Sequence, residues 1–275
     1  MNISLVPFCG LGNRLNVISS ALALVAQTDH EVTVFWEQSW DCYARWDQLF
    51  QPLEGVRVVP LEAFYLKRRG WKWLGLPMFL RLFLFDHSYK ARKIWNDDFL
   101  LHTPSAKAKI YIEGNKRFCP VTLTSMLSRY YRPIPALHER IEALAAQYAP
   151  YTVGVHIRRT DHREATQDNP LEAFVAAMHQ QVEEHPDCRF YVATDDVEVK
   201  TLLVRTFPDR VVMQECVLDR DSVEGIQAAV VEMYALGRTS LIIGSRGSTF
   251  SEFAAMLYDT PIIYITEHQT RTDYK

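Results

Sequence analysis

The second half of the sequence alternates short apolar segments with longer segments of helical spacing. The apolar segments, which we predict as strands, are 153–157, 189–193, 211–213, 241–243 and 261–265. Between them, apolar residues recur at every third or fourth position, as they do on the buried face of a helix. This alternation predicts an α/β fold in which helices cover both faces of a parallel, doubly wound sheet.

The first of these predicted strands runs directly into charged residues, within the stretch YTVGVHIRRTD at 151–161. Because side chains alternate between the faces of a strand, His156 and Arg158 point the same way, Arg159 points to the other side, and Asp161 follows in the loop. A guanidinium at the carboxyl end of a parallel strand suits a phosphate, because its planar fork binds two oxygens. An arginine–aspartate ion pair that closes the strand would give the same pattern.

Two further polar turns follow predicted strands of this sheet. Thr194 and Asp195 begin the turn TDD, in which either aspartate can also cap the next helix. The turn GSRGST at 244–249 contains Ser245, Ser248 and Thr249 and opens a helix, whose amide groups and dipole favour an anion. All three turns are expected on one edge of the sheet, which predicts a diphosphate site.

The first half begins with a strand at 2–6, a glycine turn, a helix from about residue 15 to 26 and a strand at 31–36. Gly12, Asn13 and Arg14 belong to the turn FCGLGNR, whose glycines let backbone N–H groups approach a ligand closely. The match to a GxGxxG pattern ends after Gly12. The turn is therefore either part of a phosphate or sugar-nucleotide site or only a tight connection. Further strands are predicted at 56–60 and 109–113.

The segment from Lys67 to Lys93 combines eight basic residues with tryptophan, phenylalanine and leucine. Pro77 and Arg81 interrupt it, so it is too short and too charged to span a bilayer. Basic residues beside Trp71 and Trp73 suit a membrane interface, and one interpretation is peripheral contact with the inner face of a membrane. The other is a helical hairpin that packs on the N-terminal domain with its charges in solvent.

Charge and cysteine content argue against several classes of protein. The formal net charge of −3 is unlike that of a nucleic-acid-binding protein. The five cysteines are scattered without a CxxC pair, which indicates reduced thiols in a cytoplasmic protein, with neither a disulfide framework nor a zinc site. We expect no signal peptide and no transmembrane helix, since no run of about 18 apolar residues occurs. Prolines at 133 and 135 mark a linker near the boundary of two predicted domains, 1–145 and 146–275.

Four motifs occur in the order GLGNR at 10–14, VHIRRTD at 155–161, ATDD at 193–196 and GSRGST at 244–249. Together they resemble the GDP-fucose-dependent fucosyltransferase superfamily, which includes bacterial nodulation fucosyltransferases, core α1,6-fucosyltransferases and protein O-fucosyltransferases. HxRRTD followed by ATDD is the specific part and is most similar to the α1,6 type. The resemblance implies a GT-B fold, in which two Rossmann-like domains with parallel, doubly wound sheets face each other across a cleft.

The resemblance also implies a division of labour between these domains. The C-terminal domain would hold most of a GDP-sugar, and the N-terminal domain would lie on the acceptor side. Transfer would invert the configuration at the anomeric carbon and would need no metal or other cofactor. Arg158 matches the family arginine on the diphosphate, Arg159 and Asp161 match residues that support transfer, and Glu232 falls where the family has an aspartate that reads the guanine edge. The implied donor-binding residues are Gly12, Asn13, Arg14, His156, Arg158, Thr194, Asp195, Glu232, Ser245, Ser248 and Thr249.

The sequence leaves the metal, the base and the acceptor open. Asp219 and Asp221 have the Asp-x-Asp spacing of metal-dependent glycosyltransferases, but aspartates before a helix are also common caps. No residue clearly matches a family catalytic base, so the acceptor's proton would pass to Asp161 or to a carboxylate of the N-terminal domain. We therefore predict a cytoplasmic fucosyltransferase that acts on a surface polysaccharide or a lipid-linked glycan. The alternatives are the same fold using another GDP-sugar and a nucleotide- or glycan-binding module without activity.

Overall fold

The computed structural model describes residues 1–26, 28–61, 76, 78–90, 107–121, 127–159, 170–216 and 219–265. The chain divides into two compact units, one comprising Met1–Ile134 and Asp219–Gln227, the other Pro135–Leu218 and Ala228–Lys275. The division falls within the predicted proline linker. It places helix α4 (Pro135–Ala145) in the second unit, whereas the sequence pattern assigned these residues to the first domain.

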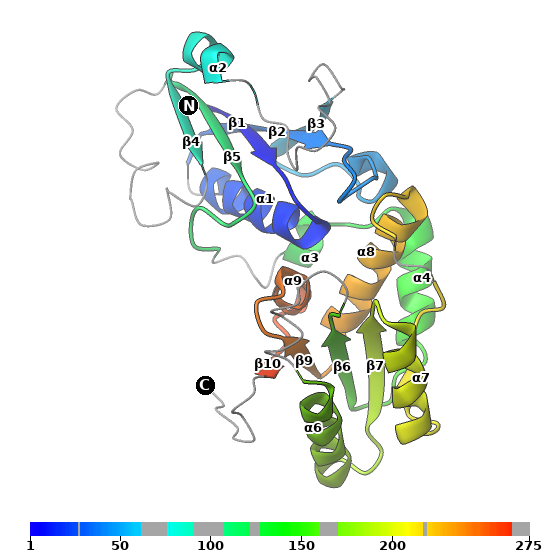
Figure 1. Cartoon of the computed structure of the whole chain (residues 1–275). Coiled ribbons are helices and arrows are strands. Elements are labelled where there is room, and N and C mark those ends of the chain that lie inside the picture. The colour runs from blue at the N-terminus through cyan, green and yellow to red at the C-terminus, as the bar shows by residue number, and fades with distance from the viewer. Residues whose placement is uncertain are drawn as a thin grey trace. The chain divides into compact units, whose positions relative to one another are not determined.

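The first unit is built on a parallel sheet with the strand order β3-β2-β1-β5-β4 (Figure 1). The strands are β1 (Asn2–Pro7), β2 (Glu31–Glu37), β3 (Val56–Leu61), β4 (His87–Lys90) and β5 (Lys109–Gly114). Helix α1 (Leu11–Val25) packs on β1 and β2 and buries most of its side chains. The shorter helices of this unit are η1 (Trp46–Gln48), α2 (Met78–Leu84) and α3 (Leu127–Tyr130).

Two features of the first unit differ from the sequence prediction. Helix α1 begins at Leu11 and not near residue 15, so Gly12, Asn13 and Arg14 lie in its first turn. Burial of Leu11 starts the packing of the helix one turn earlier than the glycine-rich pattern suggested. Strand β4 was not predicted, because four residues at a sheet edge with no buried side chain leave no apolar signal. Within the predicted basic segment, the structure describes α2, β4 and residues 76, 85 and 86. The other residues of the segment, Trp71 and Trp73 among them, lie outside the described ranges.

The second unit has a parallel sheet with the strand order β10-β9-β6-β7-β8. Its strands are β6 (Thr152–Ile157), β7 (Arg189–Thr194), β8 (Val211–Val212), β9 (Leu241–Ser245) and β10 (Ile262–Ile265). The helices between them are α6 (Leu171–Glu184), α7 (Val197–Thr206), α8 (Val223–Gly237) and α9 (Thr249–Tyr258). The first strand of the unit is central and the chain builds outward in both directions, which is the order of a Rossmann half.

The core of the second unit explains why its strands read as apolar. Every residue of β6 is buried, as expected for a parallel strand covered on both faces. Phe174 and Met178 of α6 are fully buried on one side against Val155 and Phe190 of the sheet. The two parallel sheets confirm the predicted α/β class, and the predicted cleft between the domains stays a prediction.

Candidate active site

Three polar turns follow β6, β7 and β9 at the carboxyl edge of the second sheet. In the ladder, His156 of β6 lies opposite Ala193 of β7 and opposite Gly244 of β9. These strands are parallel, so the turns that follow them leave the same edge of the sheet. The structure thus confirms that the motifs at 155–161, 193–196 and 244–249 begin at one edge.

This edge contains the point where the strand order reverses, between β6 and β9. Loops diverge at such a point and leave a crevice in which α/β proteins bind ligands. Ser245 joins the two strand ends there, because its Oγ donates to His156 O (3.2 Å) and accepts from Arg158 N (3.3 Å). The buried Ser245 hydroxyl therefore has a structural role, and its contact with a donor substrate stays a prediction.

The turn between β9 and α9 presents a helix N-terminus and an unsatisfied hydroxyl. Gly247 has a φ of 76°, a left-handed conformation that glycine adopts without strain. Ser248 occupies the N-cap position of α9, but its side chain does not cap the helix. Its Oγ is buried and has no hydrogen-bond partner among the described residues. Since buried hydroxyls are normally bonded, the Ser248 hydroxyl and the first-turn amides beginning at Thr249 have the capacity to donate to an anion, and their contact with a donor substrate stays a prediction.

His156 supplies a neutral ring beside this turn. Its imidazole is buried and stacks on Phe250 of α9, with ring centroids 5.0 Å apart. Burial, together with the positive charge of Arg158, lowers the pKa of His156 to about 4, so the ring is uncharged at neutral pH. Its Nδ1 has no hydrogen-bond partner in the described part of the chain. The ring is therefore suited to a hydrogen bond with a ligand rather than to an ion pair.

The loop after β6 is held in place from β7. Arg159 N donates to Asp195 Oδ1 (2.9 Å), while Asp196 accepts from two amides in the first turn of α7. The prediction that one of the two aspartates caps a helix is confirmed for Asp196. Thr194 is buried, and its Oγ1 accepts from the backbone N–H of Asp196 (3.3 Å). Asp161 lies outside the described residues, so its predicted support of transfer stays a prediction.

Glu232 of α8 is a buried carboxyl with unused hydrogen-bonding capacity. It is 3% exposed, and its Oε1 has no partner among the described residues. Burial raises its pKa to about 8, with smaller and opposite effects from the charges of Lys200 and Asp195. Burial and the Glu232 charge also raise the pKa of Tyr191, whose buried hydroxyl has no hydrogen-bond partner in the same described set. The negative charge of Asp195 slightly raises the pKa of both Glu232 and His156.

In the first unit, Arg14 is used by the protein itself. Its side chain is fully buried and lies over the ring of Trp36, 5.0 Å from the centroid. Its guanidinium donates to four groups: the carbonyl oxygens of Cys9 and Glu37, Ser39 Oγ and Asp41 Oδ1. Arg14 thus ties the turn after β1 to the loop after β2. Its predicted contact with a donor substrate stays a prediction, as do those of Gly12 and Asn13.

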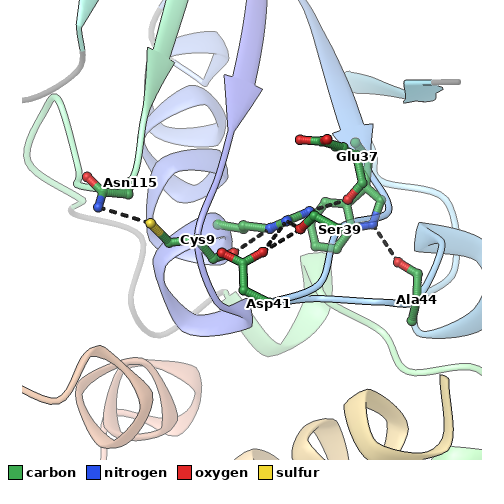
Figure 2. A network of polar contacts seen from close by, with 8 residues as sticks. Cys9, Glu37, Ser39, Asp41, Ala44 and Asn115 are labelled. Carbon is green, nitrogen blue, oxygen red and sulfur yellow. Dashed lines mark hydrogen bonds and ion pairs between the residues drawn. The ribbon is translucent and has the colours of Figure 1, made fainter. Parts of the chain in front are cut away.

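Figure 2 shows this network at the carboxyl edge of the first sheet, around Cys9, Ser39 and Asp41. Cys9 has a φ of 67°, which is costly for a residue other than glycine. Its carbonyl oxygen accepts from Arg14 Nε (2.6 Å), and its Sγ accepts from Asn115 Nδ2 (3.3 Å). These contacts hold the strained turn that precedes α1. The sequence pattern did not indicate Asp41 or Asn115, whose only signal is a position shortly after a predicted strand.

A second ion pair at this edge, between a half-buried arginine and a buried glutamate, was also not predicted. Arg81 of α2 donates to Glu113 of β5 (2.6 Å), and Tyr111 also donates to this carboxylate (3.2 Å). The Arg81 guanidinium lies over the Tyr111 ring, 4.6 Å from its centroid. The buried carboxylates Asp41 and Glu113 are therefore each bound to an arginine, which makes them poor candidates for the catalytic base.

The Asp-x-Asp motif lies at the start of α8. Asp219 and Asp221 are exposed, and Asp219 Oδ1 accepts from the backbone N–H of Asp221 (3.2 Å). The helix itself is capped by Ser222, whose Oγ accepts from Gly225 N (3.0 Å). Within the described ranges, no group of three or more histidine, cysteine, aspartate or glutamate side chains is placed to hold a metal ion.

Comparison with known proteins gives matches among solved structures. No family model matches the sequence, and no curated protein sequence matches it. The fucosyltransferase NodZ from Bradyrhizobium matches with a TM-score of 0.66 and 17% identity over 97% of this chain and 96% of that chain. A variant of Arabidopsis thaliana FUT1 in complex with GDP gives 0.65 and 15% over 99% and 72%. POFUT1 in complex with GDP-fucose gives 0.55 and 16% over 96% and 97%. The chain therefore has the fold that these fucosyltransferases share, as its motifs predicted.

Proposed function

We propose that this protein is a glycosyltransferase that transfers fucose from GDP-fucose to a glycan. The observation that carries the proposal is the set of groups at the β6–β9 edge: Arg158, the unsatisfied Ser248 hydroxyl and the N-terminus of α9. A cation, a hydroxyl donor and helix amides at one sheet edge are suited to a diphosphate. The shared fold and the GDP and GDP-fucose bound by its structural relatives support GDP-fucose as the donor.

The proposed reaction is an inverting displacement without a metal. The acceptor hydroxyl attacks the anomeric carbon, the bond from that carbon to the β-phosphate oxygen breaks, and GDP leaves. Negative charge grows on the β-phosphate in the transition state, where Arg158 and the α9 amides stabilise it more than in the ground state. Arg159 supports this site. Asp161 is the proposed acceptor of the hydroxyl proton. Asp41 and Glu113, the buried carboxylates among the described residues of the first unit, are engaged by arginines.

Glu232 is the proposed reader of the guanine base. Guanine presents two neighbouring N–H donors, which an ionised carboxylate can accept together. Glu232 holds its proton at neutral pH because burial raises its pKa to about 8. Binding of guanine would favour the charged form, so GDP binding should release a proton near pH 7. Uracil and cytosine do not present the same donor pair, which predicts preference for GDP over UDP and CMP.

A thermal-shift series with GDP, UDP and CMP tests the donor class. A nucleotide at about 100 times its dissociation constant should stabilise the folded protein by roughly 2.7 kcal/mol. GDP should give such a shift and UDP and CMP much less, and equal shifts would overturn the GDP assignment. Turnover with GDP-fucose and GDP-mannose in parallel then separates a fucosyltransferase from an enzyme for another GDP-sugar. Stabilisation without turnover of any donor would identify a binding module.

We also propose that α2 contacts an anionic membrane surface and so brings the enzyme to a lipid-linked acceptor on the inner face. On an ordinary surface helix the apolar side faces the protein, but on α2 it faces outward. Arg81 binds the buried Glu113, while Phe79, Leu82 and Phe83 are 61%, 75% and 86% exposed. Monomeric soluble domains seldom expose so many large apolar side chains together. Neighbouring basic residues in the sequence would add attraction to anionic lipids. In the described part of the chain, no helix has both the length and the hydropathy to cross a membrane.

A further inference from the structure

The loop at 38–45, which follows β2, displays two aromatic side chains at the carboxyl edge of the first sheet. Trp40 is 54% exposed and Tyr43 is 40% exposed. Single exposed aromatic residues are common on proteins, so exposure by itself indicates no function. What distinguishes this loop is the way in which its backbone is held.

The turn that carries Trp40 is closed on both sides. Ser39 N donates to Cys42 O (3.3 Å), and Cys42 N donates to Ser39 O (3.0 Å), so Trp40 and Asp41 form the tip of a two-residue turn. Asp41, the residue after Trp40, is buried and accepts from Arg14 (3.2 Å) and from Ser39 Oγ. The backbone on either side of Trp40 is thus fixed by hydrogen bonds.

The segment that carries Tyr43 is fixed in the same way. Tyr43 N donates to Arg220 O (3.0 Å), and Trp36 Nε1 donates to Ala44 O (2.8 Å). Trp36 is itself buried beneath the Arg14 guanidinium. A surface loop that only connected β2 to the next element would need no buried arginine at its base. The network instead gives the two exposed rings a rigid support, as binding sites require.

The chemistry of the surroundings selects the kind of ligand. The charge that directly follows Trp40 in the turn is that of Asp41, which is buried and neutralised by Arg14. This pair offers no net charge to a phosphate or a carboxylate at the tip of the turn. The face of an aromatic ring is weakly negative and attracts the weakly positive C–H groups of an apolar face. A pyranose ring has such a face, with its hydroxyl groups directed to the rim.

We propose that Trp40, assisted by Tyr43, is a stacking surface for a neutral sugar ring of the acceptor glycan. This inference rests on the proposed glycosyl transfer and names the part of the first unit that binds its acceptor. The loop leaves the same sheet edge as the turn that contains Cys9, because β1 and β2 are parallel neighbours. The acceptor surface therefore lies at the edge that also carries the first turn of α1.

The test compares Trp40→Ala, Tyr43→Ala and Trp40→Phe with the native protein on a printed array of neutral oligosaccharides, in the presence of saturating GDP. Tyr258→Ala is the matched control, because Tyr258 is 39% exposed but lies at the C-terminal end of α9. We expect Trp40→Ala to lower oligosaccharide binding at least 10-fold and Tyr43→Ala to lower it less. Trp40→Phe should retain most of the binding, and Tyr258→Ala should leave it unchanged.

The GDP-induced thermal shift, recorded for every variant, separates failure of this proposal from failure of the proposed function. If the native protein is stabilised by GDP but binds no oligosaccharide, or if Trp40→Ala binds as the native protein does, the stacking surface is refuted while the donor assignment stands. If GDP stabilises none of the proteins, the proposed function itself fails. Co-sedimentation with anionic vesicles is measured for the same variants. If Trp40→Ala no longer co-sediments but still binds oligosaccharide, Trp40 belongs to a membrane surface and the acceptor assignment is wrong.

Discussion

Replacing Glu232 by glutamine should remove a loss of stability that the native protein undergoes as the pH rises. The difference in unfolding free energy between the variant and the native protein should therefore grow with pH, in favour of the variant. The folded protein holds the Glu232 proton up to a pKa of about 8, whereas the ordinary value for glutamate is 4.5. Between these values the unfolded chain has released the proton and the folded chain has kept it. Unfolding is therefore favoured by rising pH, and the native protein loses stability across this window. Glutamine has no proton to release, so the variant lacks this loss.

The size of the effect follows from the pKa difference. Each pH unit within the window changes stability by about 1.4 kcal/mol. From pH 5 to pH 7 the variant should therefore gain about 2 to 3 kcal/mol over the native protein. This free-energy difference is not reduced for screening by solvent, because Glu232 is only 3% exposed. Any constant effect of the substitution on packing cancels in this comparison between two pH values.

Urea unfolding at pH 5 and pH 7, followed by far-UV circular dichroism, measures this difference. All six tryptophans lie within Met1–Ile134, so tryptophan fluorescence records the first unit separately. Glu183→Gln is the matched control, since Glu183 is an exposed glutamate on α6 of the second unit. This variant controls for the loss of one carboxylate from the second unit.

The substitution that raises stability near neutral pH should lower the affinity for GDP. Glu232→Gln should weaken GDP binding, because glutamine offers one acceptor oxygen and no charge to the guanine donors. Calorimetry in buffers of different ionisation enthalpy should detect a proton released when the native protein binds GDP near pH 7, and none for the variant. A stability difference that is the same at pH 5 and pH 7 would refute the burial argument. Unchanged GDP affinity would refute the role in guanine binding.

Three further predictions concern the site and α2. Arg158→Ala should lower turnover on the order of 100-fold or more, and Arg158→Lys should restore little, because a point charge does not replace the bidentate fork; native rates in either variant would make Arg158 a structural residue. Transfer should persist in excess EDTA, whereas loss of activity that manganese restores would bring Asp219 and Asp221 into the site. Phe79→Ser combined with Phe83→Ser should abolish co-sedimentation with anionic vesicles at low salt, while Val197→Ser, which alters a side chain 75% exposed on α7, should not; native protein that stays in the supernatant would refute the membrane contact.

The architecture of the second unit was largely predictable because its signals are local. Apolar runs marked the five strands, and the turns at their carboxyl ends followed from the parallel order that regular alternation imposes. His156, Asp195 and Ser248 could thus be assigned to one edge from the order of residues alone. In the first unit, a four-residue edge strand and an early helix start left no such signal, and β4 and the first turn of α1 were missed.

The state of the polar side chains was decided by tertiary structure alone. Arg14 follows two glycines in the sequence, which gave no sign that packing would bury it in a pair with Asp41, 27 residues away. The segment that contains Arg81 was predicted either to contact a membrane or to form a hairpin with its charges in solvent. Neither interpretation indicated that Arg81 pairs with Glu113 across 32 residues and turns the apolar face of α2 outward. A sequence determines which residues can form a strand or a helix through contacts a few residues apart. Whether a charge ends in water or in a desolvated pair depends on chain segments that only the fold brings together.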